Sequence, residues 1–315
     1  MEKKKPIQVI FDTDIGGDCD DAGALALLHQ LCQRGEAKLL AVTACYASPY
    51  VAGCIDAINR YYGRCVPVGI NYNVYNPNVN VYAEALCTEF ENTYSQERYA
   101  AGNIPDTLTV LRRTLAAADD NSVTIVATGS MASLARLVQS GSDDISPLTG
   151  AELIEKKVCR TVVMGGRFYE TWPMKILLSD GFEVTWEWNI HADVKAAQTM
   201  CDLWPGELVL SSYEIGLYCV TMKTYAQDAR VDNPVRRAYE LHPSGRNGRE
   251  SWDHTAMLEA IRPDTYWYYH PYGRVSVDDE GVTTWHKDPQ GRHTYLIPKV
   301  DYEAVRAEID ALVGE

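Results

Sequence analysis

The fold is decided by residues 8–25, whose sequence is QVIFDTDIGGDCDDAGAL. The apolar residues at its start, with Ile7 just before them, predict a short buried strand. Glycines and a run of aspartates follow at once, and leucines then recur at helical spacing, so a helix is expected to begin near Asp20. The order of strand, acidic turn and helix places Asp14 at the end of the strand. It also places Asp20 and Asp21 in the first turn of the helix.

The acidic turn holds more negative charge than a helix start stabilises. Its five carboxylates belong to Asp12, Asp14, Asp18, Asp20 and Asp21. The helix dipole favours negative charge there, but its effect is small beside the repulsion among clustered carboxylates in a low dielectric. We therefore expect a bound cation. The available ligands are oxygens, and only one thiol is nearby, which favours calcium or magnesium over zinc. The alternative is an acidic loop that caps the helix and faces solvent, although a cap requires only one aspartate.

Two other kinds of metal-binding protein also place aspartates in this way. An EF-hand loop starting at Asp12 would need a glutamate at its last position, where Gly23 stands, and a helix in front, where a strand is predicted. A magnesium-dependent phosphohydrolase with an aspartyl nucleophile also ends its first strand with Asp-x-Asp. Such enzymes usually continue with Gly-Thr, whereas this chain continues with Ile15 and Gly16. The phosphohydrolase stays a weaker alternative.

Composition excludes some partners. The chain has 315 residues and a net charge of −14, so it has no basic field for a nucleic-acid polymer. Its first apolar run is too short for a signal-peptide core, and no later run would span a bilayer, so we expect no membrane association.

The nine cysteines are odd in number and scattered. We interpret them as reduced thiols of a cytoplasmic protein.

The chain alternates predicted strands and helices, which is typical of a parallel sheet with right-handed crossovers. We predict an α/β fold: a mostly parallel central sheet with helices on both faces, a Rossmann-like open sheet, in one domain spanning 1–315. Residues from about 270 to 315 form an appendage with a small antiparallel meander and a last helix. Two long loops, 71–104 and 167–187, interrupt the alternation, and a flexible basic loop, 244–249, precedes a late helix. The other expected strands are 38–43, 66–70, 123–128, 159–164 and 207–211, the expected helices are 51–62, 106–118, 131–138, 151–157, 192–203 and one from 253, and the final elements are 274–277, 282–286, 293–297 and 302–313.

Ligands of open α/β sheets bind outside the carboxyl ends of the strands. The polar residues expected at that edge are Ser48, the Thr128–Gly129 pair, the Gly165–Gly166 pair and the loop before Asn189. We expect them to converge with the acidic turn on one site.

Five blocks of the chain, in this order, resemble the calcium-dependent nucleoside hydrolases. The similarity extends over residues 7–260, about four-fifths of the chain. Each block is weakly specific alone, but the ordered set is specific. The blocks are DTDIGGDCDDA (12–22), VATGSMASLA (126–135), VVMGG (162–166), EWNI (187–190) and WDHTA (252–256).

The resemblance implies a nucleoside hydrolase-like fold and roles for individual residues. Calcium would be held by Asp14, Asp21, Asp253 and the backbone carbonyl of Thr128, and Asp14 would also be the general base towards a calcium-bound water. The ribose hydroxyls would contact Asp20, Met164, Glu187 and Asn189. The expected reaction is hydrolysis of the N-glycosidic bond of ribonucleosides, in nucleoside salvage and purine metabolism. Carboxylates would stabilise its oxocarbenium-like transition state. A homo-oligomer, a dimer or tetramer, is also implied.

The chain departs from the family pattern in several places. The first block is two residues longer than usual and has Ile15 where proline is common, so Asp18 is an alternative to Asp20 at the ribose. Ser48 stands where many members have asparagine. Trp252 stands where pyrimidine-tolerant members have histidine and purine-preferring members tryptophan, which favours purine ribosides.

Other interpretations of these residues stay open. Met164 lies on an apolar strand and would more often be a core residue. Glu187 and Asn189 would also suit a plain turn into a helix, with Asn189 as the N-cap. Trp252 would also suit simple packing of its helix. Beside the enzyme stands a catalytically silent, calcium-dependent binder of nucleosides or ribose, although a binder has no need of an activated water.

Overall fold

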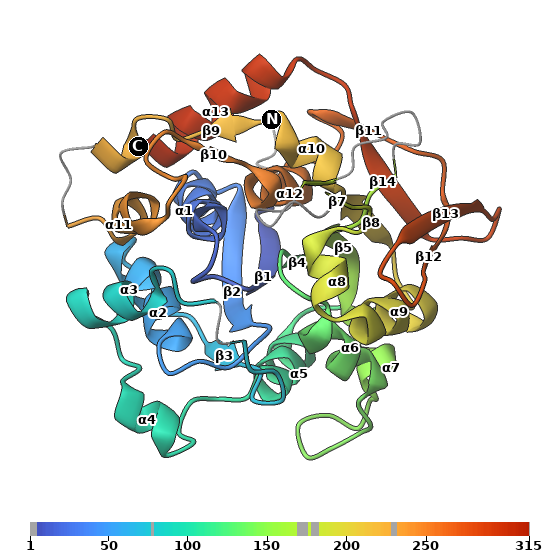
Figure 1. The fold of residues 1–315 in the computed structure, drawn as a ribbon. Helices are drawn as coiled ribbons and strands as arrows, with labels where there is room; N and C mark the ends of the chain where they lie inside the picture. The colour runs from blue at the N-terminus through green and yellow to red at the C-terminus, as the bar shows by residue number, and fades with distance from the viewer. Residues whose placement is uncertain (1–4, 77–78, 169–175, 178–182, 228–231, 315) are drawn as a thin grey trace.

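Strand β1 (Ile7–Thr13) lies at the centre of the sheet because it pairs in parallel on both sides, with β2 (Ala37–Ala44) and with β4 (Val123–Ala127). This computed structural model describes residues 5–76, 79–168, 176–177, 183–227 and 232–314. Within them the large sheet has ten strands, in the order β13-β12-β14-β8-β5-β4-β1-β2-β3 with β11 paired to β14 (Figure 1). Its other members are β3 (Val68–Ile70), β5 (Val158–Met164), β8 (Leu208–Ser211), β11 (Trp267–Tyr269), β12 (Gly273–Val277), β13 (Thr283–Lys287) and β14 (His293–Pro298).

Helices cover both faces of the sheet and enclose two separate apolar cores (Figure 1). Alternate residues of β1 point to opposite faces, so Val9 and Phe11 belong to one core and Ile10 to the other. The first core is covered by α1 (Cys19–Gln33), α2 (Val51–Tyr61), α11 (Pro234–Leu241), α12 (Trp252–Ile261) and α13 (Tyr302–Gly314). The second is covered by α5 (Thr107–Ala117), α6 (Ala132–Gln139), α7 (Gly150–Lys157) and α9 (Val194–Leu203).

The predicted fold class is confirmed. Every pair from β3 across to β8 is parallel, and the C-terminal strands β12 and β13 form an antiparallel hairpin. Strand β14 pairs antiparallel with β12 but parallel with β8, so the meander continues the central sheet at its edge. None of the helices in the described residues is long and apolar enough to cross a membrane.

Several elements differ from the sequence prediction. The 71–104 excursion contains two short helices, α3 (Ala83–Glu89) and α4 (Gln96–Ala100). The expected loop at 167–187 lies largely outside the described residues, although β6 (Ile176–Leu177) pairs there with β7 (Glu183–Val184). The remaining elements, which were not predicted, are α8 (Trp188–Ala192), α10 (Tyr213–Leu217), β9 (Val220–Thr221), a 3-10 helix (Tyr225–Gln227) and β10 (Arg249–Glu250).

A buried histidine in α1 makes the fold sensitive to acid. His29 is fully buried, its Nε2 lies 2.8 Å from Oδ1 of Asn59, and its ring stacks on Tyr62. Burial lowers the pKa of His29 to about 3, whereas in an unfolded chain it is about 6.5. Below about pH 6.5 the histidine of the unfolded state takes up a proton that the native state does not bind. The stability contributed by the neutral imidazole is therefore lost as pH falls from about 6.5 towards 3.

We expect His29→Gln to reduce this acid sensitivity. Between pH 7 and pH 5 the free energy of unfolding should fall by about 2 kcal/mol less in the variant than in the parent. Urea unfolding at the two pH values measures the difference. His286→Gln, at an exposed position in β13, is the control and should behave as the parent does. An equal pH dependence in parent and His29→Gln would contradict the prediction.

Candidate active site

The carboxyl ends of β1, β4 and β5 meet at one edge of the sheet and bring Asp14, Thr128 and Gly165 together. The register pairs Asp12 with Ala127, and the backbone N–H of Thr128 donates to the carbonyl of Asp12 at 2.9 Å. Gly129 has no side chain, which allows its backbone to lie close to Asp14. A Cβ at this position would lie 2.8 Å from the backbone nitrogen of Asp14 and 2.9 Å from its Cβ. The Thr128 carbonyl is thereby held beside the acidic turn.

Two helix starts contribute the other carboxylates. Asp18 caps α1 by accepting the backbone N–H of Cys19 at 2.7 Å, and Asp20 and Asp21 lie buried in the first turn. Helix α12 brings Asp253, which is also buried, and its backbone N–H donates to Oδ2 of Asp20 at 3.2 Å. Carboxylate oxygens of Asp20, Asp21 and Asp253 lie within 4.8 Å of one another. Two of the expected metal ligands, Asp21 and Asp253, thus lie together, and Asp20, which was expected at the ribose, lies with them.

The buried carboxylates resist ionisation unless a cation joins them. Burial, followed by the charges of neighbouring aspartates, raises the pKa of Asp20, Asp21 and Asp253 well above its usual range. Burial and then the charge of Asp18 raise the pKa of Asp14 to about 7. A bound cation favours the charged form and opposes both effects. These oxygens and the Thr128 carbonyl match the ligands of a hard divalent cation, so the residues fit a metal of that class.

Threonine hydroxyls orient one of the carboxylates. The hydroxyl of Thr13 donates to Oδ1 of Asp21, and the hydroxyl of Thr128 lies 3.3 Å from the same oxygen. Thr13 was not singled out from the sequence, although it lies between the two aspartates of Asp12-Thr13-Asp14. Its role depends on a contact across the turn that the spacing does not reveal.

Glu187 and Asn189 lie at the same edge of the sheet. Glu187 caps α8: its Oε1 accepts the N–H of Asn189 at 2.8 Å, and its Oε2 accepts those of Ile190 and Gly166, each at 3.1 Å. The helix cap is therefore Glu187, and the interpretation of Asn189 as the N-cap is wrong. Burial raises the pKa of Glu187 to about 7, although its three backbone hydrogen bonds oppose the shift.

The amide of Asn189 connects two strand ends. Its Nδ2 donates to the Thr128 carbonyl at 2.9 Å and to the Met164 carbonyl at 3.2 Å, and it lies 3.1 Å from Sδ of Met164. Met164 is buried at the end of β5. Both residues therefore lie against the Thr128 end of the site.

Three of the predicted site residues have other partners. The Asp18 carboxylate forms an ion pair with Arg249, whose Nε lies 2.9 and 3.0 Å from its two oxygens. Ser48 serves the turn into α2, since its hydroxyl accepts the N–H groups of Tyr50 and Val51. Trp252 is the first residue of α12 and is half-buried.

Trp252 is held by residues that sequence reasoning did not connect to it. Its indole N–H donates to the carbonyl of Tyr213 at 2.9 Å, and the two rings stack with centroids 5.5 Å apart. The guanidinium carbon of Arg249 lies 4.9 Å from the centroid of the Trp252 ring. Arg249 belongs to the segment expected to be a flexible basic loop, but it is part of strand β10. Its basic charge was visible in the sequence, but its partners were not.

Comparison with known proteins assigns the chain to a family. Residues 9–307 match the model of the inosine-uridine preferring nucleoside hydrolases. The protein belongs to this family, whose enzymes are N-glycosyl hydrolases. No curated protein matches the sequence.

Solved structures share the fold at low sequence identity. An inosine-uridine preferring nucleoside hydrolase from Bacillus anthracis is 19% identical with a TM-score of 0.68, covering 97% of this chain and 98% of its own. A purine-preferring ribonucleoside hydrolase from Gardnerella vaginalis is 14% identical with a TM-score of 0.72, over the same shares of the two chains. The type III effector XopQ, solved with adenosine diphosphate ribose, is 15% identical with a TM-score of 0.65, covering 99% of this chain and 94% of its own. At these identities the likeness supports the fold.

Proposed function

We propose that the protein hydrolyses the N-glycosidic bond of ribonucleosides to ribose and free base, with Ca²⁺ held by Asp14, Asp21, Asp253 and the Thr128 carbonyl. The observation that carries the proposal is the buried group of Asp20, Asp21 and Asp253, within 4.8 Å of one another, in a chain of this family. Burying like charges without a partner is very costly. The group is therefore difficult to explain as a structural feature alone.

The residues would divide the chemistry as follows. Asp14, at the strand end, would act as general base and accept the proton of the attacking water. When bound, calcium would make that water more acidic and fix the ribose hydroxyls. Positive charge develops on the sugar as the bond to the base breaks, and the surrounding carboxylates would stabilise it electrostatically. The proposal thus assigns the proton acceptor and the negative field to residues at one edge of the sheet.

The ribose would be held by Asp20, Glu187, Asn189 and Met164. Asp20 fits this role better than Asp18, because the Asp18 carboxylate is engaged by Arg249 and the helix cap, whereas Asp20 lies in the acidic group. Glu187 and Asn189 are buried and fixed by backbone contacts. Preorganised polar groups of this kind discriminate a substrate that lacks the matching hydroxyl.

A panel of nucleosides tests the function. The protein is incubated with inosine, guanosine, adenosine, uridine and cytidine in the presence of calcium, and released ribose is measured. Ribose release that stops on chelation and returns with calcium supports the proposal. Binding without release would favour the silent binder. Hydrolysis of a generic phosphomonoester instead would favour the magnesium-dependent phosphohydrolase. The same proposal includes a nucleoside substrate as the partner and a homo-oligomer, either a dimer or a tetramer. It also includes a role in nucleoside salvage in the cytoplasm.

We further propose that purine ribosides are preferred and that Trp252 lies against the base. The half-buried ring is fixed by the bond of its N–H to Tyr213 and by the contact with Arg249. A fixed indole stacks on a larger purine ring more favourably than on a pyrimidine, and such stacking is worth about 1–3 kcal/mol. The same contacts also fit a ring that only packs α12 onto its neighbours. The two roles must therefore be distinguished by comparing the effect of a Trp252 variant on different substrates.

Trp252→Ala is therefore expected to lower kcat/KM for inosine by about 5- to 150-fold. The loss should be much smaller for p-nitrophenyl riboside, because p-nitrophenolate is a stable anion that departs readily without further help. Trp252→Phe, which keeps an aromatic face, is the matched control and should retain most of the inosine rate. An unchanged inosine rate in Trp252→Ala, or uridine as the best substrate of the parent, would contradict the proposal.

A further inference from the structure

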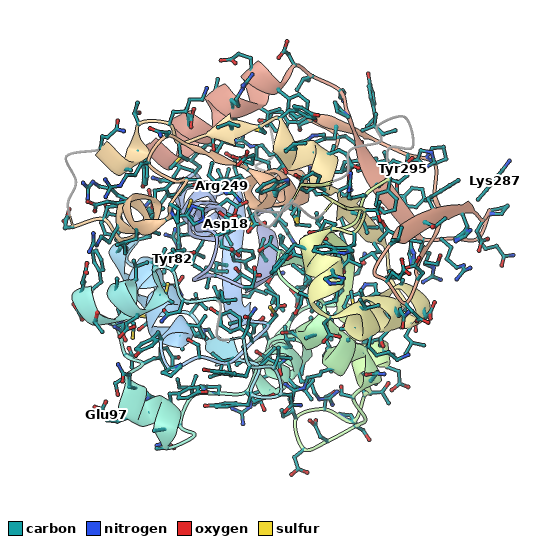
Figure 2. The ribbon with its side chains drawn as sticks, viewed as in Figure 1. Asp18, Tyr82, Glu97, Arg249, Lys287 and Tyr295 are labelled. Carbon is teal, nitrogen blue, oxygen red and sulfur yellow. The ribbon has the colours of Figure 1, made fainter. Side chains whose placement is uncertain are left out.

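Arg249 contacts two segments that lie far from each other in the sequence. Its Nε lies 2.9 and 3.0 Å from the two carboxylate oxygens of Asp18, 231 residues away, and its Nη1 lies 2.7 Å from Glu250. Figure 2 shows Asp18 and Arg249 side by side. The guanidinium is mostly buried, with 22% of the side chain exposed. It therefore forms a fixed fork rather than a loose surface contact.

The two segments are the starts of the helices that carry the acidic group. Asp18 is the N-cap of α1, whose first turn contributes Asp20 and Asp21. The Arg249 guanidinium also lies 4.9 Å from the ring of Trp252, the residue immediately before Asp253 in α12. One planar group thus contacts both helix starts. A planar guanidinium suits this position because it binds a carboxylate through two N–H groups and also contacts an aromatic face.

The charge of Arg249 also matters at this place. Burial disfavours the Asp18 carboxylate, but the hydrogen bonds and charge of Arg249 outweigh that effect and hold the pKa of Asp18 below its usual range. The guanidinium therefore places a positive charge at the start of α1.

We propose that Arg249 is a positioning residue that holds the starts of α1 and α12 together and so sets the spacing of Asp20 and Asp21 relative to Asp253. This inference rests on the proposed metal-dependent function. The two helices pack against each other, and the hydrogen bond between their starts, from the N–H of Asp253 to Oδ2 of Asp20, is long at 3.2 Å. Loss of Arg249 would allow the helix starts to move apart under the repulsion of their carboxylates. Residues that orient metal ligands in this way typically affect metal affinity by about 10- to 100-fold.

The chain offers a matched control at the other end of α12. Arg262 is the C-cap of this helix, and its Nε and Nη2 lie 2.7 and 2.9 Å from the carboxylate of Glu36. Its side chain is 19% exposed, similar to that of Arg249. Arg262→Ala therefore removes a comparable two-bond ion pair from the same helix, together with the bonds of Arg262 to Glu308 and Tyr266, while leaving the acidic group alone.

The test measures calcium affinity by isothermal titration calorimetry on the parent, Arg249→Ala and Arg262→Ala. Arg249→Ala is expected to bind calcium about 10- to 100-fold more weakly, whereas Arg262→Ala keeps the parent Kd even if its Tm falls. Arg249→Lys should bind calcium more tightly than Arg249→Ala, because lysine keeps the positive charge, but less tightly than the parent, because it lacks the paired N–H groups of the guanidinium. Asp18→Ala should weaken binding, and combining it with Arg249→Ala should add little to the loss caused by Arg249→Ala alone.

The outcomes separate this inference from the proposed function. Parent-like calcium affinity in Arg249→Ala, or equal losses in the two arginine variants, would overturn the positioning role alone. A parent that binds calcium but cleaves no ribonucleoside would overturn the function and leave the positioning role to be judged by the affinities. A parent that binds no calcium would overturn both.

Discussion

Replacing Asp14 by asparagine is expected to lower kcat for ribonucleoside hydrolysis by at least about 10³-fold, because the proposal gives this residue two tasks. It would hold the metal and also accept the proton of the attacking water. The amide of asparagine is nearly isosteric but neutral and cannot act as a base at neutral pH. Steady-state release of ribose from inosine, with calcium in excess, measures the loss.

Asp12→Asn is the matched control for this prediction. Asp12 lies in β1, two residues before Asp14, and its Oδ1 accepts the hydroxyl of Thr43 at 2.5 Å within the sheet. An asparagine can keep that contact through its carbonyl oxygen, so the loss of activity should stay below about tenfold, the effect of a typical hydrogen-bond change. An Asp14→Asn protein that binds calcium and turns over like its parent would show that Asp14 is neither base nor ligand.

The sequence was sufficient to predict those parts of the site that depend on local order. A strand followed by an acidic turn and a helix places Asp14, Asp20 and Asp21, and parallel strands bring Thr128 to the same edge. These inferences follow from the side-chain period and from the geometry of parallel sheets. The helix α1 indeed starts at Cys19, close to the expected position.

Contacts between distant segments could not be predicted in this way. Arg249 binds Asp18 across 231 residues, and no local pattern in a glycine-rich basic loop identifies its partner. Glu187, rather than Asn189, caps α8, since its longer side chain reaches back to two N–H groups of the helix and also to Gly166. Likewise, the C-terminal hairpin showed an antiparallel pattern, but nothing in it indicated that β14 would pair in parallel with β8.

The short helices of the 71–104 excursion were missed for a different reason. Helix α3 has seven residues and α4 has five, too few for the apolar period of 3.6 residues to be recognised. Helix α4 begins at a serine cap, in which the side chain of Ser95 accepts the N–H of Arg98. A single cap residue without a periodic run predicts a turn as well as it predicts a helix.

The sugar should be discriminated strongly at its 2′ position. Adjacent residues of a helix point about 100° apart, so we expect Asp21 to face the metal and Asp20, with Glu187 and Asn189, to face the ribose hydroxyls. All of these polar side chains are at most 6% exposed. A 2′-deoxynucleoside would leave them without a partner, which typically costs far more than the lost contact itself.

We therefore expect kcat/KM to be on the order of 10³-fold lower, or more, for 2′-deoxyinosine than for inosine. The two substrates share a base, so contacts with Trp252 cancel from the comparison. The same comparison is then made with Asp20→Asn. If Asp20 contacts the 2′-hydroxyl, the variant should lose more activity on inosine than on 2′-deoxyinosine. The ratio of the two kcat/KM values should therefore be smaller in the variant than in the parent. Equal rates of the parent on both substrates would rule out a buried ribose site. A ratio that Asp20→Asn leaves unchanged would instead assign the discrimination to Glu187 and Asn189, because these are the remaining buried polar side chains proposed to face the sugar.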